Sequence, residues 1–225
     1  MNIIPQTVLA LGLLLAPLSV QAQDQAPAAA PAVAPADAEA KYQALLAAAK
    51  AGTGPVDWKA LRYADADRPS YVPDAPDPNR VAMIKATDRR DWLAMLDLAQ
   101  KVIDKNYLDA RAHETAAAAN EALGHADAAK HELDIAIGLF SSMRTGSGLL
   151  EGLSYDTAYA VIAVREEYDV LNMRHRIMQR QRLDMHGGHT YDVLDVTDEA
   201  GQSPETYYFQ IDRVWAAETR MFTPH

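Results

Sequence analysis

The chain has 225 residues, no cysteine and a formal net charge of −10 at pH 7. The lack of cysteine excludes disulfides, thiol nucleophiles and thiolate metal ligands, so stability must come from core packing. The negative charge argues against nucleic acid and anionic membranes as partners, because both would repel this protein.

The N-terminal residues are typical of an exported protein. Residues 8–18 are almost wholly apolar, and Val20-Gln21-Ala22 places small or medium residues where a signal peptidase reads them. The apolar run is shorter than the ~20 residues of a membrane-spanning helix, and no cysteine follows it for lipid attachment. We therefore expect a cleaved signal peptide over residues 1–22, a periplasmic or secreted protein, and no transmembrane segment after cleavage.

Residues 23–37 are rich in Ala and Pro. Such a segment buries too little apolar surface to offset its ordering entropy, so we expect a disordered linker. Helix signals then dominate residues 38–145. An amphipathic pattern predicts a helix over residues 40–51, and a shorter helix is expected over residues 57–63. An extended, irregular connection should follow, because prolines interrupt it at four positions: Pro69, Pro73, Pro76 and Pro78.

An internal repeat organises the next part of the chain. The repeat spacing is close to the ~34 residues of a tetratricopeptide unit. In that family a small residue lets two helices approach and an apolar residue fills the groove between them, roles that we assign to Ala129 and Leu133. The aligned positions are Ala94, Leu98 and Lys101 with Ala129, Leu133 and Ala136.

This repeat predicts helices over residues 89–105, 110–123 and 125–143. Asp109 is the expected N-cap of the second helix, and Gly124 occupies the turn before the third. Because about three or more repeats are needed for a stable solenoid, another layer must close these hairpins.

The C-terminal part supplies that layer. Residues 158–164 are β-rich, and residues 166–173 return to a helical pattern. Three strands are then expected over residues 177–185, 191–197 and 206–211, with turns at residues 186–189 and 198–201. Such short connections require antiparallel pairing. The predicted fold class is α+β: tetratricopeptide-like antiparallel helix hairpins (38–145) packed with a small antiparallel sheet in residues 146–225, as one compact domain.

Three stretches of the chain resemble a family of exported bacterial proteins of unknown function. The resemblance implies one domain with helical repeats and a sheet, and it implies no activity. The chain departs from the family pattern around residues 148–153, where the usual short acidic glycine loop is longer and more apolar. The stretches are Lys41–Tyr63, Tyr107–His113 running into the helical repeat, and a third that includes Ser147-Gly148, Thr157–Ile162, Glu166-Glu167-Tyr168, Tyr191-Asp192-Val193 and Tyr207–Ile211.

One turn is a candidate metal site. Asp184, His186, His189 and Asp192 crowd a short segment, and imidazole suits zinc, copper or nickel. The alternative is a hairpin whose glycines supply positive φ and whose histidines are solvated. No known ligand spacing is matched, and no other cofactor is indicated.

A basic cluster is a candidate partner-binding face. On a strand, Arg174, Arg176, Arg180 and Arg182 would share one face. They could bind an acidic partner or a carboxylated glycan. The alternative is pairing within the sheet, with Asp192, Asp195, Glu205 or Asp212.

Motifs for catalysis are lacking in the sequence. Glu166 and Glu167 are neighbours and cannot face one substrate together, so they are expected to offset a helix dipole. No nucleophile elbow, phosphate loop or dinucleotide fingerprint is found. We therefore expect a non-enzymatic periplasmic binding or scaffold protein whose partner is another envelope protein or a peptide. The alternatives are a metal-binding protein or metal-dependent enzyme using His186 and His189, and an envelope-stress or immunity protein.

Overall fold

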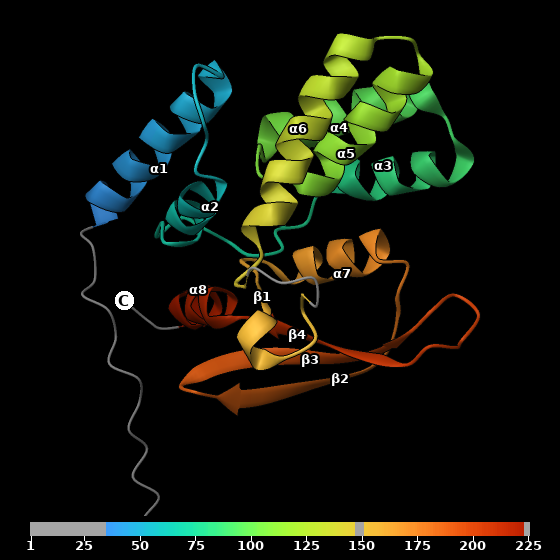
Figure 1. Cartoon of the computed structure of the whole chain (residues 1–225). Coiled ribbons are helices and arrows are strands. Elements are labelled where there is room, and N and C mark those ends of the chain that lie inside the picture. The colour runs from blue at the N-terminus through green and yellow to red at the C-terminus, as the bar shows by residue number, and fades with distance from the viewer. Residues whose placement is uncertain (1–34, 147–150, 223–225) are drawn as a thin grey trace, which may run out of the picture. The chain divides into compact units, whose positions relative to one another are not determined.

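The computed structural model describes residues 35–146 and 151–222, and in this part of the chain six α-helices precede the first strand (Figure 1). The predicted signal peptide and most of the predicted linker lie outside the described residues. The described residues belong to one compact unit. The six helices are α1 (Pro35–Ala51), α2 (Trp58–Ala66), α3 (Pro78–Arg89), α4 (Trp92–Lys105), α5 (Ala110–Ala122) and α6 (Ala126–Ser142).

The helix ends follow from local chemistry. The Asp109 carboxylate accepts a hydrogen bond from the Ala112 amide at 3.0 Å, which confirms this residue as the N-cap of α5. The sequence pattern does not predict helix α3, because it places Pro78 in the irregular connection. Proline is well suited to the first helical position, where no N–H bond is needed, and the Asp77 side chain caps this helix. At its N-terminal end, α1 includes residues 35–37, which the amino-acid composition places in the linker.

Helices α3 to α6 pack in chain order, each against the next. The α5–α6 pair confirms the predicted helix hairpin, but one assigned role is wrong. Leu133 does not fill the groove: it is 45% exposed, whereas Ala136 and Leu139 are buried. The helical period turns Leu133 away from α5 once these two residues face the core.

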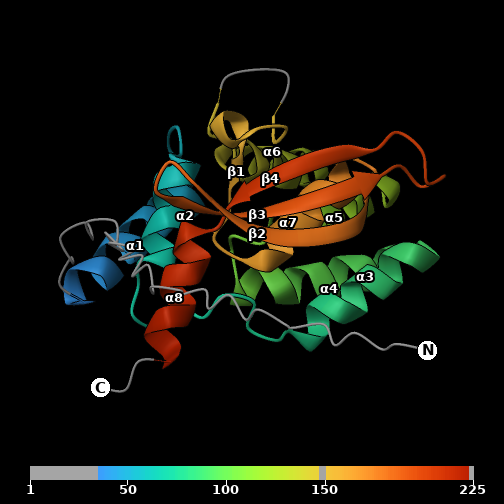
Figure 2. The same cartoon turned by 90° about the horizontal axis from the view of Figure 1, so that it is seen from below.

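The sheet has the strand order β1-β4-β3-β2 and is mixed (Figure 2). One outer pair corrects the expectation of a purely antiparallel sheet, because β1 runs parallel to β4, whereas β2–β3 and β3–β4 are antiparallel. The long connection between β1 and β4 in the sequence allows the parallel orientation. Of the β-rich residues 158–164, only two form a strand. The C-terminal elements are the short 3-10 helix η1 (Tyr155–Thr157), β1 (Tyr159–Ala160), α7 (Val164–Met173), β2 (Ile177–His186), β3 (His189–Thr197), β4 (Glu205–Gln210) and α8 (Asp212–Phe222).

Helices and sheet share one apolar core. Leu61 from α2, Leu139 from α6 and Phe209 from β4 are buried in the same cluster. Gly138 lets α2 approach α6, since a Cβ at that position would lie 2.2 Å from the indole nitrogen of Trp58. Helix α7 lies between the α3–α6 helices and the sheet (Figure 1). None of the helices in the described ranges has the length and apolar content needed to cross a bilayer.

Candidate functional site

The proline-rich connection between α2 and α3 forms one wall of a pocket of about 460 Å³. Residues from α1, α2, α3, α4, α7 and the α4–α5 connection complete the pocket, so segments far apart in the sequence meet there. Its charged lining is balanced, with four acidic and four basic side chains: Asp65, Asp74, Asp77, Asp109, Arg68, Arg80, Lys105 and Arg165.

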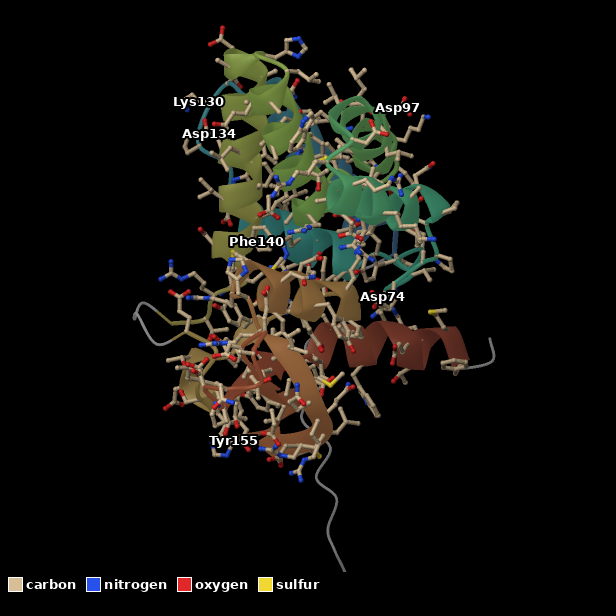
Figure 3. The ribbon with its side chains drawn as sticks, turned by 90° about the vertical axis from the view of Figure 1, so that its right-hand side faces the viewer. Asp74, Asp97, Lys130, Asp134, Phe140 and Tyr155 are labelled. Atoms are coloured by element: carbon tan, nitrogen blue, oxygen red, sulfur yellow. The ribbon has the colours of Figure 1, made fainter. Side chains whose placement is uncertain are left out.

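Asp74 positions α7 at the pocket. Its carboxylate accepts hydrogen bonds from the Val164 amide at 2.7 Å and the Arg165 amide at 2.8 Å. The first turn of α7 has no side-chain cap from its own N-cap residue, Ala163. Asp74 therefore caps a helix that lies about ninety residues further along the chain, and it does so from a left-handed backbone conformation with φ of 54°. Figure 3 shows this residue beside α7.

Arg80 joins three elements at the pocket wall. From α3 its guanidinium binds the Asp109 carboxylate at 2.8 Å and both oxygens of Asp169 on α7 at 2.7 Å. Burial raises the pKa of Asp169, and the Arg80 guanidinium acts against that rise. One guanidinium nitrogen donates to both Asp169 oxygens, and this charge-assisted contact fixes α7 against the helical layer.

The far side of the pocket is held by Arg68. Its guanidinium pairs with Asp65 at 2.5 Å and lies over the Tyr42 ring, 4.2 Å from the ring centre. Burial raises the pKa of Tyr42 to about 12. The Tyr71 hydroxyl donates a hydrogen bond to the Ile162 carbonyl at 2.8 Å, which ties the connection to the segment before α7.

Arg165 is the least engaged cation of the pocket. Its closest carboxylates, on Asp74 and Asp109, lie 3.8 and 3.9 Å away, beyond hydrogen-bond distance. Within the described residues its guanidinium makes no side-chain hydrogen bond, although only 21% of the side chain is exposed. Burial acts to lower the Arg165 pKa, but Tyr71 and the surrounding carboxylates raise it overall. The pocket thus contains a cation whose N–H donors are not taken by a side-chain acceptor among the described residues.

Glu166 is a structural residue beneath this pocket. It pairs with the fully buried Arg62 at 2.5 Å and accepts a hydrogen bond from the Ile162 amide at 2.8 Å. Arg62 also donates to Ser142 at 3.3 Å and to the Ala160 carbonyl at 3.1 Å. The pair therefore connects α2, α6, β1 and α7.

Glu167 is buried on the sheet side of α7, next to Asp192 of β3. Burial and the neighbouring Asp192 raise the pKa of Glu167 to about 9. Neither oxygen of an ionised Glu167 finds a donor, but a protonated Glu167 can donate to Asp192. The sequence placed both glutamates correctly in the first turn of a helix but missed their burial, because it does not show which layers cover that turn.

The four metal candidates do not form one ligand set. Asp184 accepts a hydrogen bond from the Tyr155 hydroxyl at 2.5 Å, and the His186 ring stacks on Tyr155 with centroids 4.1 Å apart. The His189 imidazole contacts Asp212 at 2.6 Å. Asp184 pairs with Tyr191 across the hairpin, so the next residue, Asp192, points to the opposite face. In residues 35–146 and 151–222, no group of three or more His, Asp or Glu side chains could hold a metal ion.

The four arginines make ion pairs within the chain. Arg174 ends α7 and Arg176 precedes β2, so the expectation that all four share one strand face is wrong. Arg174 donates to the Tyr159 hydroxyl at 2.9 Å. The predicted in-chain partners Asp195 and Glu205 are found, whereas Asp192 and Asp212 do not pair with these arginines. The contacts are Arg176 with Glu205 at 2.9 Å, Arg180 with Asp195 at 3.2 Å and Arg182 with Asp195 at 3.0 Å.

Comparison with known proteins gives one match to a family model, described as a domain of unknown function, over residues 39–220. Neither the curated proteins nor the solved structures contain a match to this chain. The matched residues include the whole pocket and every strand.

Proposed function

We propose that this chain, which belongs to the DUF4919 family, is a non-enzymatic binding protein. The geometry of its pocket indicates that it holds a carboxylate-bearing segment of a partner at Arg165. The partner is an envelope protein or peptide, in keeping with the signal peptide expected over residues 1–22. The observation that carries this proposal is the Arg165 guanidinium, which lies in a pocket and lacks a hydrogen-bonded carboxylate.

The pocket suits a polar segment of a polypeptide. An arginine binds a carboxylate with two parallel N–H···O bonds, whether the carboxylate belongs to an acidic side chain or to a C-terminus. The surrounding acidic side chains can accept amide or ammonium donors from the same segment. A volume of about 460 Å³ lies within the range of roughly 300–1,000 Å³ that is usual for ligand pockets.

The helical layer supports a protein partner. Helices α3 to α6 form two consecutive hairpins that we interpret as tetratricopeptide-like, and such hairpins present concave surfaces to peptides. Arg80 and Val81 of α3 and Lys105 of α4 line the pocket. A peptide seated there would therefore contact the helical array and α7 together.

A binding role fits the state of the pocket's other charged groups. The carboxylates of Asp65, Asp74 and Asp109 are engaged in ion pairs or helix caps. Groups held in this way bind and orient a ligand better than they transfer its protons. The alternatives of a metal-dependent role at His186 and His189 and of an envelope-stress or immunity protein are not favoured by any contact among the described residues.

Peptide selection on the purified full chain tests the proposal. We expect a random peptide library with free C-termini to yield binders rich in carboxylates. Replacing Arg165 by Gln should weaken their binding about tenfold or more, a loss on the order of 1.4 kcal/mol. Isothermal titration calorimetry would measure the affinities.

The matched control is Arg89→Gln, which removes the same charge at the exposed end of α3. This variant should bind within about twofold of the wild type, because surface charges contribute little at a distance. Equal affinity of the wild type and the Arg165→Gln variant for the selected peptides, or failure to select any peptide, would disprove the proposal.

A further inference from the structure

Strand β2 lies at the edge of the sheet, paired on one side with β3. It is ten residues long, and no strand of the described chain pairs with its other side. Such an edge presents a row of unpaired backbone N–H and C=O groups that can pair with another strand.

The hairpin geometry determines which residues present those groups. Two glycines with φ of 59° and 82°, Gly187 and Gly188, form the turn, and His186 and His189 close it. Hydrogen-bonded pairs alternate along an antiparallel ladder. Residues 182, 184 and 186 therefore bond to β3, while the backbone groups of residues 181, 183 and 185 point to the free edge.

Apolar side chains line this part of the edge. Leu183 is 59% exposed and Met185 is 70% exposed, and the period of two places both on one face. Exposed apolar residues on a long edge strand mark an association site.

We propose that two copies of this chain associate through antiparallel pairing of their β2 strands, with the two-fold axis at Leu183. This pairing joins the two four-stranded sheets into one continuous sheet and packs Leu183 of one copy against Leu183 of the other. The occupant of the edge is thus a second copy of the same chain.

Charge complementarity selects this register. With the axis at Leu183, Arg182 of each copy lies opposite Asp184 of the other, and Gln181 lies opposite Met185. Shifting the axis to Arg182 also satisfies the backbone, but it places the two Arg182 guanidinium groups opposite each other. Opposite charges across a strand pair stabilise it and like charges destabilise it.

The side chains can make these contacts with one change of hydrogen-bond partner. Arg182 donates one hydrogen bond to Asp195, and a guanidinium has five N–H groups. Asp184 accepts from the Tyr155 hydroxyl and from the Met185 amide. Edge pairing transfers the Met185 amide to the Gln181 carbonyl of the other copy, which leaves an Asp184 oxygen to accept from Arg182 of that copy.

The two-fold pairing also limits growth. A symmetric interface uses the same edge of both copies and closes on itself. The opposite edge of the sheet is β1, which has two residues and is too short to add another copy in the same way.

Charge reversal tests both the interface and its register. The wild-type full chain should sediment between the mass of one chain, 24.6 kDa, and twice that mass as its concentration is raised. Arg182→Asp and Asp184→Arg should each abolish self-association, because each variant places like charges opposite each other. An equimolar mixture of the two variants should form a heterodimer, because every Asp then faces an Arg. A wild-type chain that stays monomeric at high concentration, or a mixture that stays monomeric, would overturn the proposal.

Cysteine cross-linking provides a second measurement, since the chain has no cysteine of its own. Leu183→Cys should form a disulfide-linked dimer under mild oxidation, whereas the control Lys130→Cys, at an exposed position of α6, should remain monomeric. Equal cross-linking of the two variants would count against the proposed axis.

Discussion

At the scale of the residue, Glu167 shows how burial changes the role of a charged side chain. It occupies the first turn of α7, where a negative charge would favour the helix dipole. Its 1% exposure and its contact with Asp192 favour the protonated form instead. In that form Glu167 can donate a hydrogen bond to Asp192 at the junction of α7 and β3.

This assignment predicts a pH-dependent stability. In the unfolded chain Glu167 ionises near its ordinary pKa of 4.5, whereas in the folded chain its pKa is about 9. The stabilising contribution is complete below pH 4.5 and is lost as the pH rises toward 9. Relative to wild type, Glu167→Gln should gain stability by roughly 1 kcal/mol per pH unit between pH 5 and 8.

Urea unfolding at several pH values measures this difference. Glu121→Gln, at an exposed position of α5, is the control and should follow the wild-type pH profile. If Glu167→Gln followed that profile as well, the carboxyl group would be ionised in the folded protein.

At the scale of the element, α7 depends on a cap supplied from another part of the chain. Two of its free amides bind the Asp74 carboxylate. The same carboxylate lies at the pocket wall, so the helix end and the candidate site are built together. Local sequence around α7 contains no sign of this arrangement, because its own N-cap position is Ala163.

Removal of the cap should loosen α7. We expect Asp74→Ala to lower the free energy of unfolding by about 1–2 kcal/mol and to speed amide exchange at Val164 and Arg165. Asp74→Asn should cost less, because its amide oxygen still accepts a bond and asparagine tolerates the left-handed backbone.

Hydrogen exchange and urea unfolding would measure both effects. The control Asp127→Ala changes an exposed acidic residue in the first turn of α6 that makes no capping bond. Unchanged exchange at the start of α7 in Asp74→Ala would show that the cap is dispensable.

At the scale of the whole molecule, the Arg62–Glu166 pair holds the helical layer and the sheet layer together. Arg62 is 0% exposed and Glu166 is 4% exposed. Breaking such a pair leaves one buried charge without a partner, which costs more than the pair itself contributes. The folded structure therefore needs both residues or neither.

A double-mutant comparison tests this point. Arg62→Met should destabilise the protein by about 3–5 kcal/mol, and adding Glu166→Met should restore a substantial part of that loss. Urea unfolding should give coincident transitions by far-UV circular dichroism and tryptophan fluorescence, because the two layers share a core. The control Lys130→Met breaks an exposed ion pair with Asp134 (labelled in Figure 3) and should change stability by less than about 1 kcal/mol. A double variant as unstable as the sum of its single variants would show that the residues act independently.

The sequence by itself determined the features that depend on near neighbours. Helical period and capping located α4, α5 and α6 and the Asp109 cap, and the glycine pair located the β2–β3 hairpin. These signals are local because a helix turn or a hairpin turn involves only a few consecutive residues.

Tertiary structure alone decided the rest. The parallel β1–β4 pair, the position of Leu133, the pocket around Arg165 and the buried Glu167 all depend on how separate segments of the chain pack together. Burial and charge pairing follow from which layers meet, and that information is carried by the packed core and not by any stretch of the sequence.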